Sequence, residues 1–391
     1  MRRIVLLGIG HTNAEFVRRC ADEPIKDCEL VCVSNFPTVT YSGMLPGTLA
    51  DQFDDAEMRI DLQQLADRAN AKFVLAETTG LDWQRFEKPA LTFANRPPID
   101  FDALSVGVGS MPIGWEEQGE AARVVPIKPM QTFLCRLERQ LRSAAKSGEE
   151  ILRVVIVGGG VASVEVALCL QQHWAGWLQQ ESPQPTLHIT ILTSSTHVAK
   201  GMTDRSIRRI EKLLTERAIR SVTNVTVAKV DGRSVVTTGD ETFSADCTIW
   251  ATGAGAPPVL RKLGLQADDR GFLATHPTLQ SVSDPRVFAV GDAGTVINNP
   301  SPKAGVYAVR QSPILWHNVQ AFLKGRRLQE FRPQSDFLKI LNTGDGKGLL
   351  EKGRWTFHAR WCWHLKTWID RKFVRQFPHP NQPSHQFSDS L

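Results

Sequence analysis

The chain of 391 residues lacks any apolar run of the ~18 residues that a membrane-spanning helix requires. The apolar start at residues 4–7 is shorter than the core of a signal peptide and ends in a glycine turn. We therefore interpret it as a first strand and predict a cytoplasmic protein.

Paired cysteines and strong charge are also missing. The seven cysteines have unrelated spacings, which is typical of a protein from a reducing compartment, and no metal site is predicted. The net charge of +5 comes without a dense Lys/Arg run or an RNA-binding signature. Nucleic acid is therefore not a predicted partner.

Two glycine-rich turns are present, about 150 residues apart. The first contains Gly8 and Gly10, and the second contains Gly158 and Gly160. Each follows an apolar strand and opens a helical stretch, so the backbone can approach a pyrophosphate at a helix N-terminus. Two such turns, with Gly291-Asp292 downstream, predict a protein that binds two dinucleotides and carries out redox chemistry.

Both turns depart from the usual pattern in the same way. Asn13 and Ser163 stand where a third glycine normally permits close packing of helix and strand. The acid that usually binds a ribose is also missing, since Ser34-Asn35 and Ser194-Ser195 follow the second strands. The choice between NADH and NADPH therefore stays open.

The spacing of apolar residues predicts further elements. Helices are expected at about 12–22, 60–69, 162–177, 205–217 and 303–323, and residues 35–47 are expected to form a loop. The fold class is α/β, with strand and helix alternating in two similar units.

Several longer motifs resemble those of a known family. They are Gly10-His11-Thr12, Tyr41-Ser42-Gly43-Met44-Leu45-Pro46-Gly47, Asn342-Thr343-Gly344-Asp345 and Trp363-His364-Leu365-Lys366-Thr367-Trp368-Ile369-Asp370-Arg371. The chain resembles the FAD-dependent pyridine nucleotide-disulfide oxidoreductase superfamily, nearest to type II NADH dehydrogenases. Within it, the chain is similar to the NADH dehydrogenase-like module found fused to selenide, water dikinase.

The resemblance implies a fold of two Rossmann-like dinucleotide-binding domains, as in glutathione reductase, plus a C-terminal segment. The expected FAD-binding domain covers residues 1–125 and 266–328, and the expected NAD(P)H-binding domain covers 126–265. Residues 329–377 would form a C-terminal α+β or amphipathic segment. The polar residues 378–391 are expected to be a disordered tail.

The resemblance also implies site residues for FAD and for NADH or NADPH. The flavin residues would be Gly8, Gly10, His11, Ser34, Ser42, Gly43, Gly109, Gly291, Asp292, Lys303 and Ala304. The nicotinamide residues would be Gly158, Gly160, Val161, Glu165 and Gly253. Glu165 would lie between nicotinamide and flavin, and Lys303 would tune the reduced flavin as the second catalytic residue.

The predicted reaction is hydride transfer from NAD(P)H to flavin, followed by electron transfer to a quinone or another small acceptor. A sulfide:quinone-type enzyme is an alternative, although Cys169 and Cys362 do not stand where that family places its cysteines. A flavin-bound regulatory or scaffold protein, linked through the fused relatives to selenium metabolism, is another. A homodimer also stays open.

The C-terminal segment is rich in tryptophan and arginine. Four of the ten tryptophans fall between Trp355 and Trp368, among several basic residues. A basic amphipathic helix with aromatic residues can lie in a membrane interface, so residues 355–377 predict peripheral contact with the cytoplasmic face of a membrane. The alternative is that this stripe packs on the flavin domain or on a subunit partner.

Overall fold

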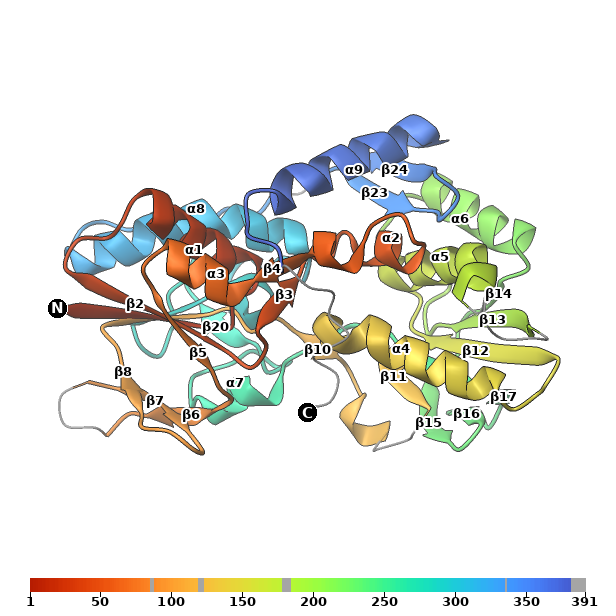
Figure 1. The fold of residues 1–391 in the computed structure, drawn as a ribbon, viewed down its shortest axis with the longest axis horizontal. Helices are drawn as coiled ribbons and strands as arrows, with labels where there is room; N and C mark the ends of the chain where they lie inside the picture. The colour runs from red at the N-terminus through yellow and green to blue at the C-terminus, as the bar shows by residue number, and fades with distance from the viewer. Residues whose placement is uncertain (85–87, 119–122, 178–183, 335, 381–391) are drawn as a thin grey trace.

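Two parallel sheets, each in its own lobe, form the framework of the molecule (Figure 1). The computed structural model describes residues 1–84, 88–118, 123–177, 184–334 and 336–380. Among these residues, no helix combines the length and the apolar character needed to cross a bilayer.

The first sheet has the strand order β21-β9-β1-β2-β5. Its members are β1 (Arg2–Leu7), β2 (Cys28–Ser34), β5 (Lys72–Leu75), β9 (Ala103–Val106) and β21 (Val287–Ala289). All neighbours are parallel, and this is the order of a Rossmann fold, in which ligands bind beyond the carboxyl ends of β1 and β9.

Strand alternation divides the residues of β1 between two cores. Ile4 and Leu6 pack with α1 (His11–Asp22), α3 (Leu62–Arg68) and α8 (Gly305–Leu323). Val5 and Leu7 face the other side, where α7 (Pro258–Lys262) and an antiparallel sheet of β6 (Thr78–Asp82), β7 (Ala90–Phe93) and β8 (Ile99–Asp100) cover the sheet. Both faces are buried, which explains the continuous apolar run.

The second sheet repeats this plan in the order β11-β18-β12-β13-β14. Its strands are β11 (Val124–Pro126), β12 (Ile151–Val157), β13 (Thr186–Leu192), β14 (Arg220–Val222) and β18 (Cys247–Trp250). One face carries α4 (Met130–Ala145), α5 (Val161–Trp177) and α6 (Asp204–Glu216). The other carries β15 (Val227–Asp231), β16 (Ser234–Thr237) and β17 (Thr242–Ser244).

Two short strands join the lobes. The chain leaves the first sheet through β10 (Met111–Pro112) and returns through β19 (Ala254–Gly255), and these two strands pair antiparallel. The remaining small elements are β3 (Thr38–Thr40), β4 (Arg59–Asp61), β20 (Leu273–Thr275), β22 (Gly294–Val296), α2 (Leu45–Leu49), η1 (Asp55–Met58), η2 (Glu116–Gln118) and η3 (Gly291–Ala293).

The C-terminal segment forms a sheet and a helix. Strands β23 (Lys339–Asn342), β24 (Gly348–Lys352) and β25 (Trp355–Ala359) are antiparallel, and α9 (Arg360–Val374) packs on them. Figure 1 shows α9 above α2 and α5. Pro378 and His379 follow and hydrogen-bond to the backbone of Asp61 and Arg59, while residues 381–391 of the predicted tail lie outside the described residues.

Three sequence-based predictions need correction. Residues 35–47 are not a plain loop, because β3 and the start of α2 lie in this stretch. The helix expected at 60 begins at Leu62, where the Asp61 side chain caps it by accepting a hydrogen bond from the Gln64 N–H. The helix expected at 303 begins two residues later, and it continues through Pro313.

The missing third glycines have a common structural replacement. Asn13 is fully buried, and its Nδ2 donates to the Gly8 carbonyl (2.7 Å) while its Oδ1 accepts from Ser105 Oγ (2.7 Å). Ser163 Oγ likewise donates to the Ala251 carbonyl (3.3 Å). A buried polar side chain thus links each helix to the neighbouring strand where a glycine would simply pack closely.

Replacing Asn13 is expected to destabilise the protein. Asn13→Ala removes these hydrogen bonds and leaves the Ser105 hydroxyl unpaired in the core, which should lower the free energy of unfolding by about 2–3 kcal/mol. Urea unfolding of the ligand-free chain measures this, with exposed Asn298→Ala as the control. Equal unfolding midpoints for Asn13→Ala and Asn298→Ala would show that the Asn13 hydrogen bonds do not take the place of the third glycine.

Candidate functional site

One cavity of about 1600 Å³ opens at the carboxyl ends of both sheets. It is larger than the 300–1,000 Å³ or so of an ordinary small-molecule pocket. Its walls come from the first glycine turn, the start of α5, the N-terminal turns of α8, β23 and one face of α9. Residues from both lobes therefore share a single site.

The first glycine turn lies tightly against the loop after β9. Gly8 has φ +75°, and a Cβ there would lie 2.6 Å from Val108 Cα. A Cβ on Gly10 would lie 2.8 Å from the Gly107 carbonyl oxygen. Gly109, with φ +79°, has open space at its Cβ position and lines the cavity. The backbone is thus exposed to a ligand at the N-terminus of α1.

His11, the first residue of α1, is uncharged at neutral pH. Burial, helped by the Lys128 charge and opposed by Asp292, lowers its pKa to about 4. Its Nε2 is buried without a hydrogen-bond partner among the described residues, and its ring packs edge-on against Tyr41 at 5.3 Å. An unpaired polar atom beside the turn is consistent with a site that is completed by a ligand.

Asp292 is held by a lysine from the other lobe. Its Oδ2 accepts from Ser110 Oγ (2.6 Å) and from Lys128 Nζ (3.2 Å), and Lys128 also donates to Ser110 Oγ (2.5 Å). All three residues line the cavity. Because Lys128 precedes α4, this ion pair also connects the two lobes.

The other residues predicted around the flavin also line this cavity. They are Ser34, Ser42, Gly43, Gly291, Lys303 and Ala304. The Ser34 hydroxyl already has a hydrogen-bond partner within the protein, because it donates to the Phe36 carbonyl (2.8 Å). Gln311, on α8, does not line the cavity, because its side chain is buried and its Oε1 accepts from the Gly291 N–H (2.6 Å).

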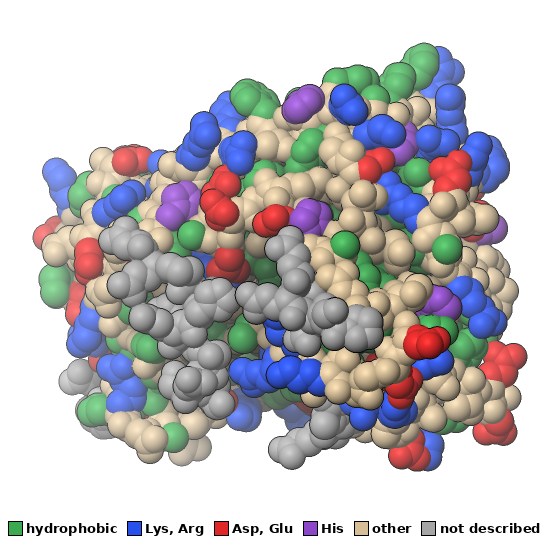
Figure 2. Space-filling model, turned by 45° about the vertical axis from the view of Figure 1, so that its right-hand side comes forward, with side chains coloured by type: hydrophobic (Ala, Val, Ile, Leu, Met, Phe, Trp, Pro, Cys, Tyr) green, Lys and Arg blue, Asp and Glu red, His purple; other side chains and the backbone are tan. Residues whose placement is uncertain are grey.

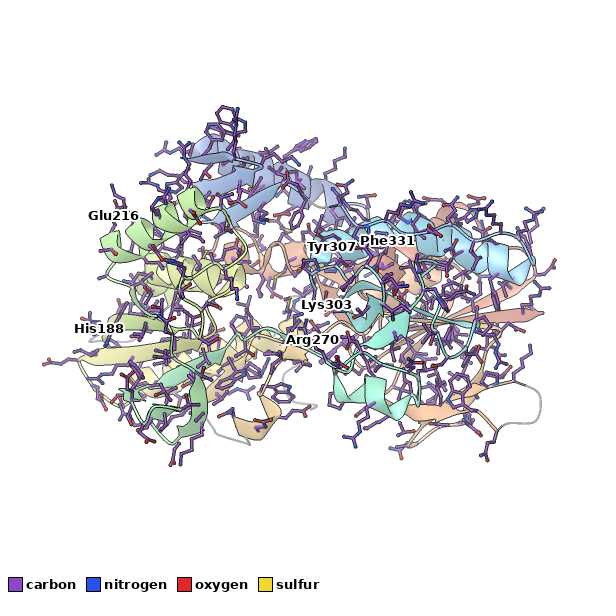
Figure 3. The ribbon with its side chains drawn as sticks, turned by 180° about the vertical axis from the view of Figure 1, so that it is seen from behind. His188, Glu216, Arg270, Lys303, Tyr307 and Phe331 are labelled. Atoms are coloured by element: carbon purple, nitrogen blue, oxygen red, sulfur yellow. The ribbon has the colours of Figure 1, made fainter. Side chains whose placement is uncertain are left out.

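The Lys303 side chain is half-buried and hydrogen-bonded to a carbonyl and a hydroxyl. Its Nζ donates to the Gly294 carbonyl (2.7 Å) and to Thr295 Oγ1 (2.8 Å), and it lies 4.0 Å from the centre of the Phe272 ring. Burial lowers its pKa to about 8. Figure 3 shows Lys303 near Arg270, in the middle of the molecule.

The second glycine turn has the same construction. A Cβ on Gly158, which has φ +114°, would collide with the Ala251 carbonyl, whereas Gly160 has open space. Gly158, Gly160 and Gly253 are not among the cavity-lining residues, but Val161 is, together with Thr252. Lys200 also lines the cavity, whereas His197 does not, and its Nδ1 lies 2.9 Å from Glu211 Oε1.

Glu165, on the first turns of α5, lines the cavity and has a strongly perturbed acidity. Burial raises the pKa of its carboxyl to about 7, against the opposing effects of the Lys366 charge and of the Asn342 N–H. That N–H donates to Glu165 Oε1 at 2.8 Å. A carboxyl that titrates near neutrality in a cleft is a candidate for proton transfer.

The C-terminal helix closes the same wall with a buried ion pair. Lys366 Nζ donates to Asp370 Oδ2 (2.8 Å) and to the Gly43 carbonyl (2.7 Å). Asp370 Oδ1 accepts from the Tyr41 hydroxyl (3.1 Å). The motif around Tyr41 and the motif on α9, which are far apart in the sequence, are thus hydrogen-bonded to each other.

All seven cysteines lie within the described residues, and none of them lines the cavity. Cys32 on β2 is buried in the core between the sheet and its helices, and the half-buried Cys28 packs against the same core. Burial raises the pKa of Cys32 to about 12, so it stays a thiol. The described cavity therefore offers no sulfur nucleophile.

A family model for pyridine nucleotide-disulphide oxidoreductases matches residues 2–320. The chain belongs to this family. It is therefore a flavoprotein oxidoreductase whose cofactors are FAD and NAD(P)H. The two-sheet architecture expected from the sequence is confirmed.

Similar curated proteins span most of the chain. The NADH dehydrogenase-like protein YutJ of Bacillus subtilis is 22% identical over 351 residues, which cover 88% of this chain and 90% of YutJ. Demethylphylloquinone reductase NdbB of Synechocystis is 22% identical over 87% of this chain and 85% of its own.

Solved structures of the same fold are also similar. The NDH2 of Plasmodium falciparum, solved in complex with NADH, has a TM-score of 0.78 at 13% identity and covers 97% of this chain and 99% of its own. The sulfide:quinone oxidoreductase of Aquifex aeolicus has a TM-score of 0.77 at 16% identity, with 96% and 92% covered.

The residues present fit two dinucleotides. Each glycine turn leaves a helix N-terminus accessible, and the cavity between them is continuous. The sequence did not reveal Lys128, Ser110 or Asn342 as site residues. Lys128 lies in a loop before a helix, and only the fold brings it to Asp292.

Lys128 is expected to support FAD binding. Without Lys128, Asp292 would keep the Ser110 hydrogen bond but lose its cationic partner beside the first glycine turn, so Lys128→Met should weaken FAD binding by about tenfold or more. Fluorescence titration of apoprotein with FAD measures the affinity. Exposed Lys146→Met, at the end of α4, is the control. Equal FAD affinity in both variants would contradict this role.

Proposed function

We propose that this protein takes a hydride from NADH or NADPH onto FAD and passes the electrons to a quinone. The observation that carries the proposal is the single cavity that has the first glycine turn of one sheet and the start of α5, directly after the second glycine turn, in its walls. The names of the relatives support it, since they include a quinone reductase and NADH dehydrogenase-like proteins. FAD supplies the chemistry of accepting a hydride and releasing electrons.

We assign the first turn to FAD and the second to NAD(P)H. In this assignment Gly8, Gly10 and the α1 N-terminus bind the pyrophosphate of FAD, and Asp292 accepts a hydrogen bond from its ribityl chain. Gly158 and Gly160 bind the nicotinamide dinucleotide. Rate acceleration then comes mainly from positioning the two rings against each other in the cavity.

The acceptor compartment that we propose lies between α8, β23 and α9. Its lining is mostly apolar, with Val306, Val309, Phe337, Ile369 and Phe373. Such a compartment suits a flat, apolar ring with carbonyl groups better than a small hydrophilic ion. The absence of a cysteine at the cavity among the described residues favours this quinone reduction over sulfide oxidation.

Glu165 is assigned to proton transfer. The balanced reaction is NAD(P)H + H⁺ + quinone → NAD(P)⁺ + quinol, in which the hydride carries two electrons and one proton. The second proton must come from solvent. A carboxyl with a pKa of about 7, beside the Lys366–Asp370 pair, can hold that proton at neutral pH and release it in the cavity.

Rapid mixing without oxygen tests the two half-reactions. NADH or NADPH is expected to bleach the flavin absorbance near about 450 nm, and a soluble quinone should restore it. Glu165→Gln should keep the bleaching and slow the recovery by about 10²-fold. In the unmodified protein, recovery should slow as the pH rises through about 7, because the proton donor is then ionised.

Gln172→Met, on the same helix as Glu165 and outside the cavity lining, serves as the control. Failure of both nicotinamides to bleach the flavin would refute the dehydrogenase proposal and favour a regulatory protein that binds flavin.

We further propose that the protein docks on an anionic membrane surface through its C-terminal segment. An aromatic–basic face is formed by Trp355, Phe357, Trp361 and Trp368 together with Lys352, Arg354, Arg360 and Lys372. The four aromatic side chains are between 42% and 60% exposed. Figure 2 shows hydrophobic and basic side chains next to each other along the upper edge of the molecule.

The α6 helix extends the positive charge beside this face. Ser206 of α6 hydrogen-bonds to Thr356 of β25 (2.9 Å), and the exposed Arg205 and Arg208 lie on the same helix. Tryptophan rings at an interface and several cations, each worth ~1 kcal/mol near an anionic surface, are sufficient for reversible binding.

Vesicle flotation tests this docking. The double variant Trp361→Ser/Trp368→Ser should lower binding to vesicles that contain anionic lipid by about tenfold or more. Leu75→Ala removes an equally exposed apolar side chain at the end of β5 and is the control. Equal flotation of both variants would contradict the proposed face and favour a subunit partner as its occupant.

A further inference from the structure

We propose that Asn342 and Gln52 form a clamp that positions Glu165 and holds its carboxylate on the Asn342 N–H. This inference deepens the proposed function, since it rests on the role given to Glu165 there. It also gives a role to the Asn342-Thr343-Gly344-Asp345 motif, which the dinucleotide sites do not use.

The clamp is built from three segments of the chain. Asn342 ends β23, and its backbone N–H donates to Glu165 Oε1 of α5 at 2.8 Å. The Asn342 side chain is fully buried, and its Nδ2 donates to Gln52 Oε1 at 2.6 Å. Gln52 follows α2, so the clamp connects both lobes to the C-terminal sheet.

The turn after Asn342 fixes the direction of its N–H. Asn342 Oδ1 accepts from the Gly344 N–H (2.9 Å), and Gln52 Nε2 donates to the Gly344 carbonyl (3.2 Å). Gly344 has φ +77°, and a Cβ there would lie 3.0 Å from the Leu168 carbonyl of α5. The turn therefore lies directly on the helix that carries Glu165, with little freedom to shift.

This arrangement acts on the protonation of Glu165. A hydrogen bond donated to a carboxylate favours its charged form and lowers its pKa, whereas burial raises it. If the N–H moves away, the charged form loses a donor and the proton is held more tightly. The clamp thus keeps the pKa of the Glu165 carboxyl close to neutral pH, where the group can both take up and release a proton.

Two variants loosen the clamp without altering Glu165. Asn342→Ala removes the bonds to Gln52 and Gly344, and Gln52→Met removes the Gln52 amide at similar volume. Asn342→Ser keeps a side-chain acceptor for the Gly344 N–H and should rescue part of the effect. Gln172→Met is the control, since Gln172 Cβ lies 3.1 Å from where a Cβ on Gly344 would be, but Gln172 makes no hydrogen bond in the clamp.

Infrared titration of the carboxyl stretch, without any nicotinamide, measures the pH at which Glu165 is half protonated. Glu165→Gln is the reference, because it lacks this carboxyl. Asn342→Ala is expected to raise the midpoint by about one pH value, a ~tenfold higher proton affinity. Gln52→Met and Asn342→Ser should give smaller increases. Unchanged midpoints in Asn342→Ala and Gln52→Met, when both remain folded by circular dichroism, would overturn the clamp.

The pH profile of flavin recovery by quinone provides the second readout. In Asn342→Ala, the alkaline limb of this profile should move to higher pH by the same amount as the infrared midpoint. A shift in the titration without a shift in this limb would overturn the role of the clamp in the reaction. Absence of flavin bleaching by nicotinamides would refute the proposed function instead, while the infrared result would still decide whether the clamp exists.

Discussion

The pairing of β10 with β19 determines where the two sheets meet. The chain crosses between the lobes twice, once through each of these strands. Because both passages follow the carboxyl end of a parallel strand, the carboxyl ends of the two sheets are directed toward a common space. The Lys128–Asp292 pair crosses that space between the same two lobes. The cavity, the two glycine turns and the position of α5 all follow from this connection.

The walls of the cavity contain charges that are balanced locally. Lys128 faces Asp292, and Lys366 faces Asp370 with side chains that are only 10% and 6% exposed. Buried pairs of this kind contribute little net stability, but removing one partner leaves an uncompensated buried charge in the cavity wall. Glu165 has no such partner at hydrogen-bond distance among the described cations, and burial raises the pKa of its carboxyl to about 7.

The sequence predicted the repeated βαβ plan well, because apolar strands and glycine turns are local signals. Asn13 and Ser163 looked like defects of the motif, since a single sequence cannot show that their side chains bond to a neighbouring strand. Lys303, expected as the cation that tunes the flavin, lines the cavity with its Nζ bonded to Gly294 and Thr295, and its role stays a prediction. Lys128, from a distant loop, is a second cation at the cavity that the sequence did not indicate, and it pairs with Asp292.

The C-terminal helix was the least predictable element, because its sequence fits two interpretations. One is packing on the protein and the other is contact with a membrane, and each would use a different side of α9. Lys366, Asp370 and Phe373 line the cavity, whereas Trp361 and Trp368 are exposed on the same helix. The inward residues are bonded to the segment around Tyr41, so α9 cannot shift on its outer side without disturbing the cavity wall. The inward residues can therefore close the cavity while the outward tryptophans occupy the opposite side of α9, so the two interpretations of this helix do not exclude each other.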